Sequence, residues 1–173
     1  RKGHVVTRED IPVLLSVGKE HLYIWEKQEG MLHENEAAEV LREISQGANM
    51  HPTEAKEGKI ELIADCDGLL KVDSATMKKV NSLGEMMIAS RHGNFPVKKG
   101  DKIAGTRVIP LIIEKEKMER AKETAGETPI FEVLPFSHKK VGIVTTGSEV
   151  YHHRIEDSFT PVIREKLAEY DTE

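Results

Sequence analysis

A short polar segment, residues 145–149, contains the side chains best suited to chemistry in this chain. It follows residues 140–144, an apolar run typical of a strand buried on both faces of a parallel sheet. Ligands of open α/β sheets bind at the carboxyl ends of such strands, where this segment would lie. Its hydroxyl groups, and backbone N–H groups that Gly147 leaves accessible, are suited to holding a phosphate. The segment therefore predicts a phosphate site, although a turn that only joins a strand to a helix has the same composition.

A longer pattern makes this interpretation more specific. The sequence V-G-I-V-T-T-G-S-E-V is followed by a basic stretch and then by R-I-E-D-S, within residues 141–158. Over residues 140–173 the chain resembles the opening of the molybdopterin-binding domain of molybdenum cofactor biosynthesis proteins. In that family the equivalent loop lies at the pterin-phosphate site. The resemblance implies a cofactor site made of Thr145, Thr146, Gly147, Ser148, Glu149, Asp157 and Ser158.

The resemblance also implies the ligand and the roles of individual side chains. Molybdopterin or adenylated molybdopterin would be the ligand, with Thr146 and Ser148 holding its phosphate. Glu149 and Asp157 would orient polar groups or a phosphate bound to Mg²⁺. The chain departs from the family pattern at Phe159, where the family has Asn, and this puts one polar contact with the ligand in doubt. Catalytic residues are not implied, so catalysis and simple binding both stay open.

Residues 1–26 resemble another segment of the same group. They read RKGHVVTREDIPVLLSVGKEHLYIWE, and molybdopterin molybdotransferases have a similar Gly-containing turn before a helix and a strand. The family's later Thr-Gly-Gly motif and its acidic residue near the metal are not found up to residue 173. We therefore expect the chain to stop within the binding domain and to be inactive by itself. A full-length molybdotransferase-like protein would assist molybdenum insertion.

Two other classes of function remain open. Competence-damage-like, nucleotide-processing enzymes share the Gly-Thr-Glu opening and a later I-x-D, but usually place this domain at the extreme N-terminus. Here about 139 residues come first, which disfavours that class. Alternatively, the first 136 residues form a noncatalytic interaction or dimerisation module, and the protein is a homo-oligomer.

Composition excludes several further functions. The net charge is -5 and basic residues never occur in runs longer than two, whereas nucleic-acid binding needs a basic face. No apolar run approaches the ~20 residues that span a bilayer, so we expect no membrane partner. Cys66 is the only cysteine, which fits a reducing compartment and a cytoplasmic location. The eight histidines include no His-x-x-x-His pair, so we expect no metal site of the protein's own.

Local patterns predict the elements that would position the loop. We expect an α+β front domain over residues 1–136, followed by the first β-α unit of an incomplete α/β molybdopterin-binding domain over residues 140–173. Apolar spacing and capping residues predict helices at 34–46, 74–83 and 159–170, and a mostly solvated helix at 114–123. Alternation and turn residues predict strands at 22–25, 59–65, 69–72, 85–90, 130–136 and 140–144, and a β segment at 97–113 that a tight turn at residues 99–101 interrupts.

Overall fold

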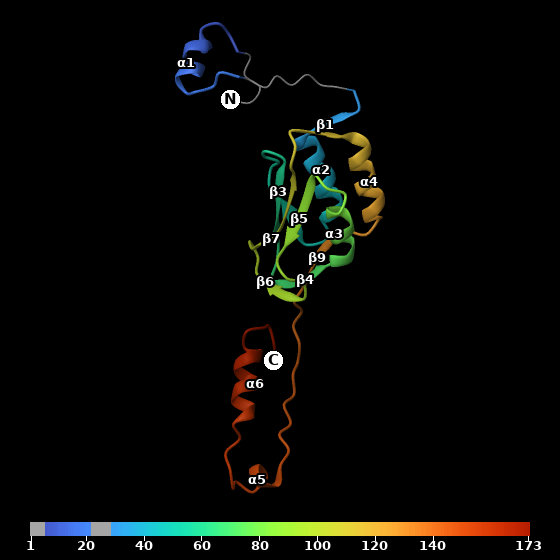
Figure 1. Ribbon diagram of the computed structural model, residues 1–173. Helices are drawn as coiled ribbons and strands as arrows, with labels where there is room; N and C mark the ends of the chain where they lie inside the picture. The colour runs from blue at the N-terminus through green and yellow to red at the C-terminus, as the bar shows by residue number, and fades with distance from the viewer. Residues whose placement is uncertain (1–5, 22–28) are drawn as a thin grey trace.

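The protein has an α+β fold, seen in a computed structural model that describes residues 6–21 and 29–173 (Figure 1). Its helices are α1 (Asp10–Ser16), α2 (Glu34–Ser45), α3 (Ser74–Asn81), α4 (Lys115–Ala125), α5 (Ser148–Tyr151) and α6 (Phe159–Leu167). Its strands are β1 (Met31–His33), β2 (Met50–Pro52), β3 (Lys59–Ala64), β4 (Gly68–Val72), β5 (Met86–Ser90), β6 (Phe95–Val97), β7 (Lys102–Val108), β8 (Ile112–Glu114) and β9 (Phe131–Pro135).

The core is built on a four-stranded antiparallel sheet with the order β2-β3-β7-β5. Its inner face carries Ile60 and Leu62 from β3, which lie opposite Thr106 and Ala104 of β7. Helix α2 packs on β3 and β7, α3 packs on β5, and α4 contacts both helices (Figure 1). The alternation of apolar and polar residues along each strand therefore places one face against helices and leaves the other in solvent.

Two smaller sheets close the ends of this core. Strands β6, β4 and β9 form one sheet in that order, and β1 pairs with β8 in the other. Phe131 and Val133 of β9 are fully buried, and the backbone N–H of Val133 donates to the carbonyl of Ala48 just after α2. All pairings between these strands are antiparallel.

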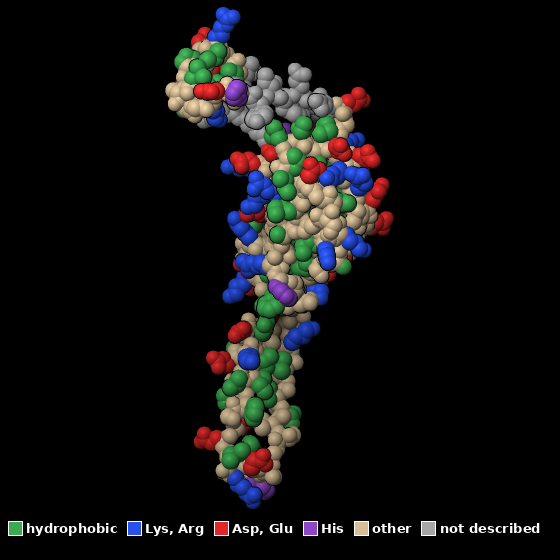
Figure 2. All heavy atoms as spheres, viewed as in Figure 1, with side chains coloured by type: hydrophobic (Ala, Val, Ile, Leu, Met, Phe, Trp, Pro, Cys, Tyr) green, Lys and Arg blue, Asp and Glu red, His purple; other side chains and the backbone are tan. Residues whose placement is uncertain are grey.

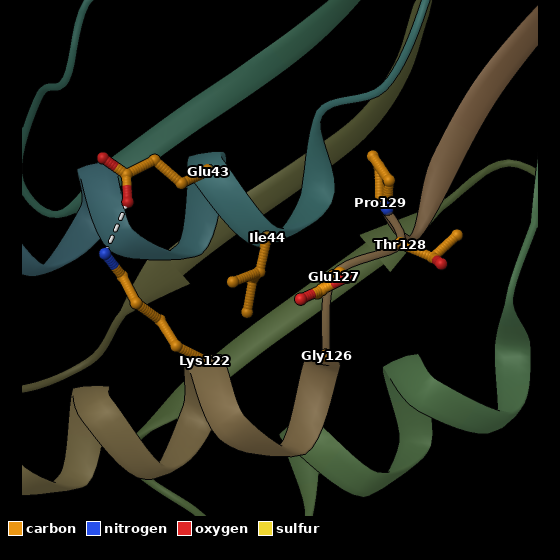
Figure 3. Close-up of a pocket in the computed structure, with 7 residues that line it drawn as sticks. All are labelled: Glu43, Ile44, Lys122, Gly126, Glu127, Thr128 and Pro129. Carbon is orange, nitrogen blue, oxygen red and sulfur yellow. Dashed lines mark ion pairs between the residues drawn. The ribbon is translucent and has the colours of Figure 1, made fainter.

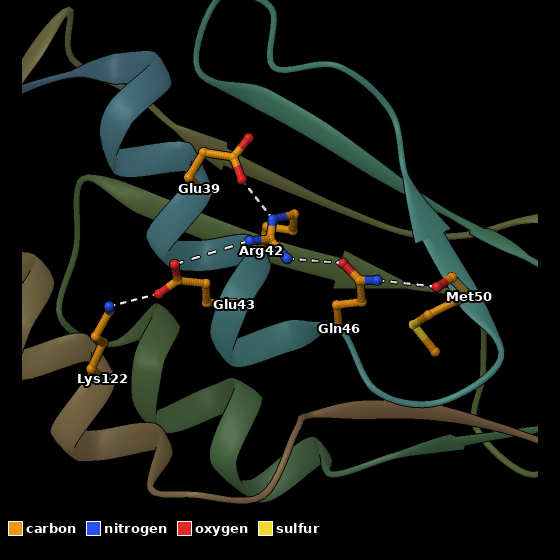
Figure 4. Close-up of polar contacts among 6 residues, drawn as sticks. All are labelled: Glu39, Arg42, Glu43, Gln46, Met50 and Lys122. Atoms are coloured by element: carbon orange, nitrogen blue, oxygen red, sulfur yellow. Dashed lines mark hydrogen bonds and ion pairs between the residues drawn. The ribbon is translucent and has the colours of Figure 1, made fainter.

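A polar network fixes the carboxyl end of α2 (Figure 4). Arg42 donates to Glu39 at 2.6 Å and to the side-chain oxygen of Gln46 at 3.1 Å. Gln46 in turn donates to the carbonyl of Met50 at 3.1 Å, which ties the helix end to the start of β2. Glu43 pairs with Lys122 of α4 at 2.6 Å. These contacts set the direction in which the chain leaves the helix.

Most of the elements expected from the sequence are confirmed. Helix α2 begins after His33, whose ring nitrogen accepts from Asn35 N–H while Glu36 accepts from His33 N–H, a capping box. Asp73 caps α3 by accepting from Thr76 N–H at 3.0 Å. The break expected at Lys99-Gly100-Asp101 is confirmed, because it separates β6 from β7, but the strand does not continue through residues 111–113 as expected, because β8 is a separate strand. Each of the three strands belongs to a different sheet, and sequence alternation alone cannot show where a strand changes partners.

The helix at 114–123 is less solvated than its charge predicts. Met118 and Ala121 of α4 are completely or almost completely buried, because they face α2 and α3. The strand expected at 22–25 lies outside the described residues.

The strand expected at 140–144 does not form a ladder, which corrects the expectation of a buried strand. These residues lie outside the named strands, and Val144 is 84% exposed. A strand of a parallel sheet needs neighbours at its edges and helices over its faces. The segment instead meets the chain end through an isolated parallel bridge between Lys139 and Thr172 and a hydrogen bond from Val141 N–H to Glu173 O. Helix α6 forms as expected but ends at Leu167, and none of its residues is buried.

We predict that Gly47→Ala destabilises the core. A Cβ at Gly47 would overlap the carbonyl oxygen of Phe131 and crowd Glu132, so the backbone of β9 would have to shift. The expected loss in the free energy of unfolding is about 1–3 kcal/mol, measured by urea denaturation. Gly105→Ala is the control, because the nearest atom to its Cβ would be 3.8 Å away. Equal stability of the two variants would contradict the close approach.

We predict that Thr106→Val stabilises the core. The Thr106 side chain is 1% exposed and its hydroxyl has no hydrogen-bond partner among the described residues. Removing an unpaired buried hydroxyl should raise the free energy of unfolding by about 1 kcal/mol. Thr128→Val, at an exposed position, should change it little. A clear loss of stability in Thr106→Val would show that the hydroxyl is bonded, and would refute the prediction.

Candidate functional site

The loop of interest joins the extended residues 139–146 to α6 and lies at the end of the molecule far from the core (Figure 1). It begins at Thr145, passes Gly147 with φ 147° and ψ 123°, and forms the single turn α5. Chain residues 152–158 then return to the start of α6. The φ of Gly147 lies in a region that a side chain disfavours, which explains a glycine at this turn.

Asp157 is the centre of the loop's hydrogen bonding. Its Oδ1 accepts from the backbone N–H groups of Phe159 at 2.9 Å and Thr160 at 3.1 Å. Its Oδ2 accepts from the hydroxyls of Thr145 at 2.9 Å and Thr160 at 2.5 Å. The carboxylate therefore joins the end of the extended segment to the first turn of α6.

These hydrogen bonds keep Asp157 ionised. The Thr160 hydroxyl, then the Thr160 backbone N–H, and then Thr145 and Phe159 lower the pKa of Asp157 from 3.8 to about 2. All of these donors favour the charged carboxylate, while partial desolvation opposes them. Both oxygens already accept two hydrogen bonds each, so the side chain has no vacant acceptor direction for a ligand or a metal ion.

The remaining loop residues have exposed hydrogen-bond donors. The N–H groups of Gly147, Ser148 and Glu149 have no acceptor among the residues that the structure describes. Thr146 and Ser148 are exposed, and the Ser148 hydroxyl makes only a long contact of 3.4 Å with the Glu149 carboxylate. Exposed N–H and hydroxyl donors in one turn are suited to an anion such as a phosphate.

Glu149 brings a negative charge to the same turn. A Cβ built on Gly147 would lie 3.3 Å from Glu149 Oε1, so the carboxylate lies close to Gly147. It would repel a bare phosphate and attract a cation bound to one. Ser158 is exposed at the N-cap of α6, and its side chain makes no capping hydrogen bond.

The structure thus places six of the seven residues implied by the sequence in two groups and leaves Ser158 apart from both. Thr145 and Asp157 meet in one hydrogen-bonded cluster, and Thr146, Gly147, Ser148 and Glu149 form the open turn beside it. Thr160 belongs to the cluster but was missed from sequence. The available signal was its position three residues after Asp157, where helix-capping aspartates accept a backbone N–H.

The start of the extended segment pairs with the last residues of the chain. Lys139 N–H donates to Asp171 O at 3.1 Å, Glu173 N–H donates to Lys139 O at 2.9 Å, and Val141 N–H donates to Glu173 O at 2.7 Å. This is a parallel pairing, reached through α6 as the crossover. The loop follows the carboxyl end of the paired segment, as in ligand sites of open α/β sheets.

Other polar groups on the molecule have structural explanations. Glu61 lies between Lys102 at 2.8 Å and Lys59 at 2.6 Å on the outer face of the sheet. These hydrogen bonds, first from Lys102 and then from Lys59, lower the pKa of Glu61 to about 2. No group of three or more potential metal-ligating side chains occurs among the described residues, and no helix in this part of the chain is long and apolar enough to cross a bilayer.

Two hollows on the core lie away from the 145–158 loop. One, of about 140 Å³, lies between the ends of α2 and α4 (Figure 3). It is lined by Glu43, Ile44, Lys122, Gly126, Glu127, Thr128 and Pro129. Cofactor sites usually measure roughly 300–1,000 Å³, so this hollow is too small. The other is an open depression along the β2–β3 connection, and neither hollow includes a residue of the 145–158 loop.

Comparison with known proteins gives one match, to a short segment at the start of the chain. Residues 1–26 match a domain of unknown function, DUF8806. No curated protein and no solved structure matches the chain.

We predict that Asp157 titrates near pH 2. Because its folded pKa is lowered from 3.8 to about 2, its contribution to loop order is complete above about pH 4. That contribution is lost as the pH falls through about 2. The ¹³C signal of the carboxyl carbon measures the midpoint, and Asp157→Asn identifies the signal by its loss. A midpoint near 4 would contradict the hydrogen bonding described.

Proposed function

We propose that the 145–158 loop binds the phosphate of molybdopterin or adenylated molybdopterin, and that the protein acts in molybdenum cofactor biosynthesis or handling in the cytoplasm. One observation carries most of the proposal. A turn with free N–H donors at Gly147, Ser148 and Glu149 follows the carboxyl end of a segment paired in parallel. The resemblance of residues 140–173 to the molybdopterin-binding domain selects molybdopterin among phosphate ligands.

The residues present are consistent with a phosphate and Mg²⁺ together. The N–H groups of the turn and the hydroxyls of Thr146 and Ser148 would hold the phosphate. The carboxylate of Glu149 would hold Mg²⁺, which prefers oxygen ligands and commonly bridges to substrate phosphates. In this proposal Asp157 positions the loop and does not contact the ligand, because both of its carboxylate oxygens already accept hydrogen bonds from the chain.

A pair of matched charge substitutions tests this proposal. Ser148→Asp places a second negative charge inside the turn, whereas Ser137→Asp places the same charge at an exposed position before the extended segment. We expect Ser148→Asp to weaken molybdopterin binding at least about tenfold, because one charge-assisted hydrogen bond is worth about 1.5–3 kcal/mol. Ser137→Asp should bind as the unmodified protein does.

Binding is measured by titrating the intact chain with molybdopterin, with and without Mg²⁺, and following calorimetric heat. If the unmodified protein does not bind molybdopterin, the proposed function is wrong. If both variants bind equally well, molybdopterin binds elsewhere and the assignment of this loop fails.

A further inference from the structure

We propose that Thr160 is a positioning residue that, through Asp157, holds Thr145 and so fixes the direction in which the phosphate-binding turn leaves the extended segment. Thr160 is outside the set implied by the sequence. Its hydroxyl lies 2.8 Å from that of Thr145, and both hydroxyls lie within hydrogen-bond distance of Asp157 Oδ2. Three residues from three segments therefore meet at one point, which we call the Thr145–Asp157–Thr160 latch.

Counting protons shows why all three members are needed. The two hydroxyls have one proton each, and an ionised carboxylate has none. Three oxygen–oxygen contacts thus share two protons, so the hydroxyl protons of Thr145 and Thr160 are both engaged inside the latch. Neither is available to a ligand. Removing the Thr160 hydroxyl leaves Thr145 with one of its two contacts in the latch, that with Asp157 Oδ2.

Thr160 also joins the latch to α6 through its backbone. Its N–H donates to Asp157 Oδ1, as does that of Phe159, in the first turn of the helix. A substitution that removes the hydroxyl alone keeps these backbone donors. The side-chain contribution to loop position can therefore be separated from capping of the helix.

Packing does not hold the loop in place. No residue from 137 to 173 is buried, and Phe159, beside Thr160, is 76% exposed. A loop without a buried anchor depends on its hydrogen bonds for its shape. The buried core lies between residues 34 and 133, so loss of the latch should leave the stability of the core unchanged.

Thr160→Val and Thr160→Ser form the test pair. Valine keeps the branched shape and the backbone N–H but removes the hydroxyl, whereas serine keeps the hydroxyl. In the full chain, we expect Thr160→Val to shift the backbone ¹H–¹⁵N signals of residues 145–149 and to lower their heteronuclear NOE. Thr160→Ser should preserve both, and core signals from β3 and β7 should be unchanged in each variant.

The ligand readout rests on the proposed function. For the phosphate of molybdopterin held by this turn, we expect Thr160→Val to raise the Kd about tenfold, the size of effect expected for one lost hydrogen bond to a charged group. Thr160→Ser should stay within about twofold.

The outcomes separate the two proposals. Unchanged loop signals in Thr160→Val would overturn the latch. Altered signals with an unchanged Kd would overturn its role in positioning the phosphate donors. If the unmodified protein does not bind molybdopterin while Thr160→Val still alters the loop and Thr160→Ser does not, the proposed function fails and the latch stands as the feature that orders the loop.

Discussion

Burial of one face of the β2-β3-β7-β5 sheet under α2 and α3 is the interaction on which the folded core depends. The two central strands, β3 and β7, supply Ile60, Leu62 and Val108 to this face, and each is fully buried. The smaller sheets and α4 attach to the same apolar cluster. The capping of α2 and α3 and the network at Arg42 then fix helix ends that burial has already brought together.

The C-terminal part of the chain is held by hydrogen bonds and not by burial. Residues 137–173 have no buried side chain, and apolar groups along the extended segment and α6 lie at the surface (Figure 2). Hydrogen bonds hold this part together: the parallel bridge at one end and the contacts of Asp157 at the other. Hydrogen bonds between exposed groups contribute little net stability, because water competes for them. Their effect here is on the shape of the loop.

This division bears on how the proposed site would work. The charge of Asp157 is used within the loop, while the donors of the turn at Gly147–Glu149 stay free for an anion. Glu149 is the carboxylate left to interact with a cation. In the proposed site, the two acidic residues would therefore have different tasks: Asp157 would shape the loop and Glu149 would face the ligand.

The sequence by itself determined the α+β class, the capped helices at Glu34 and Ser74, most strand positions and the location of the polar turn, because these follow from periodicity, capping residues and glycines read locally. Only the tertiary structure decided that β7 and β8 belong to different sheets, that Met118 is buried, and that residues 140–144 remain exposed. It also showed Thr160 as the partner of Asp157 and Thr145. These features depend on which segments meet in space. A local sequence pattern cannot predict strand pairing, burial or a hydrogen bond between residues 15 apart in the chain.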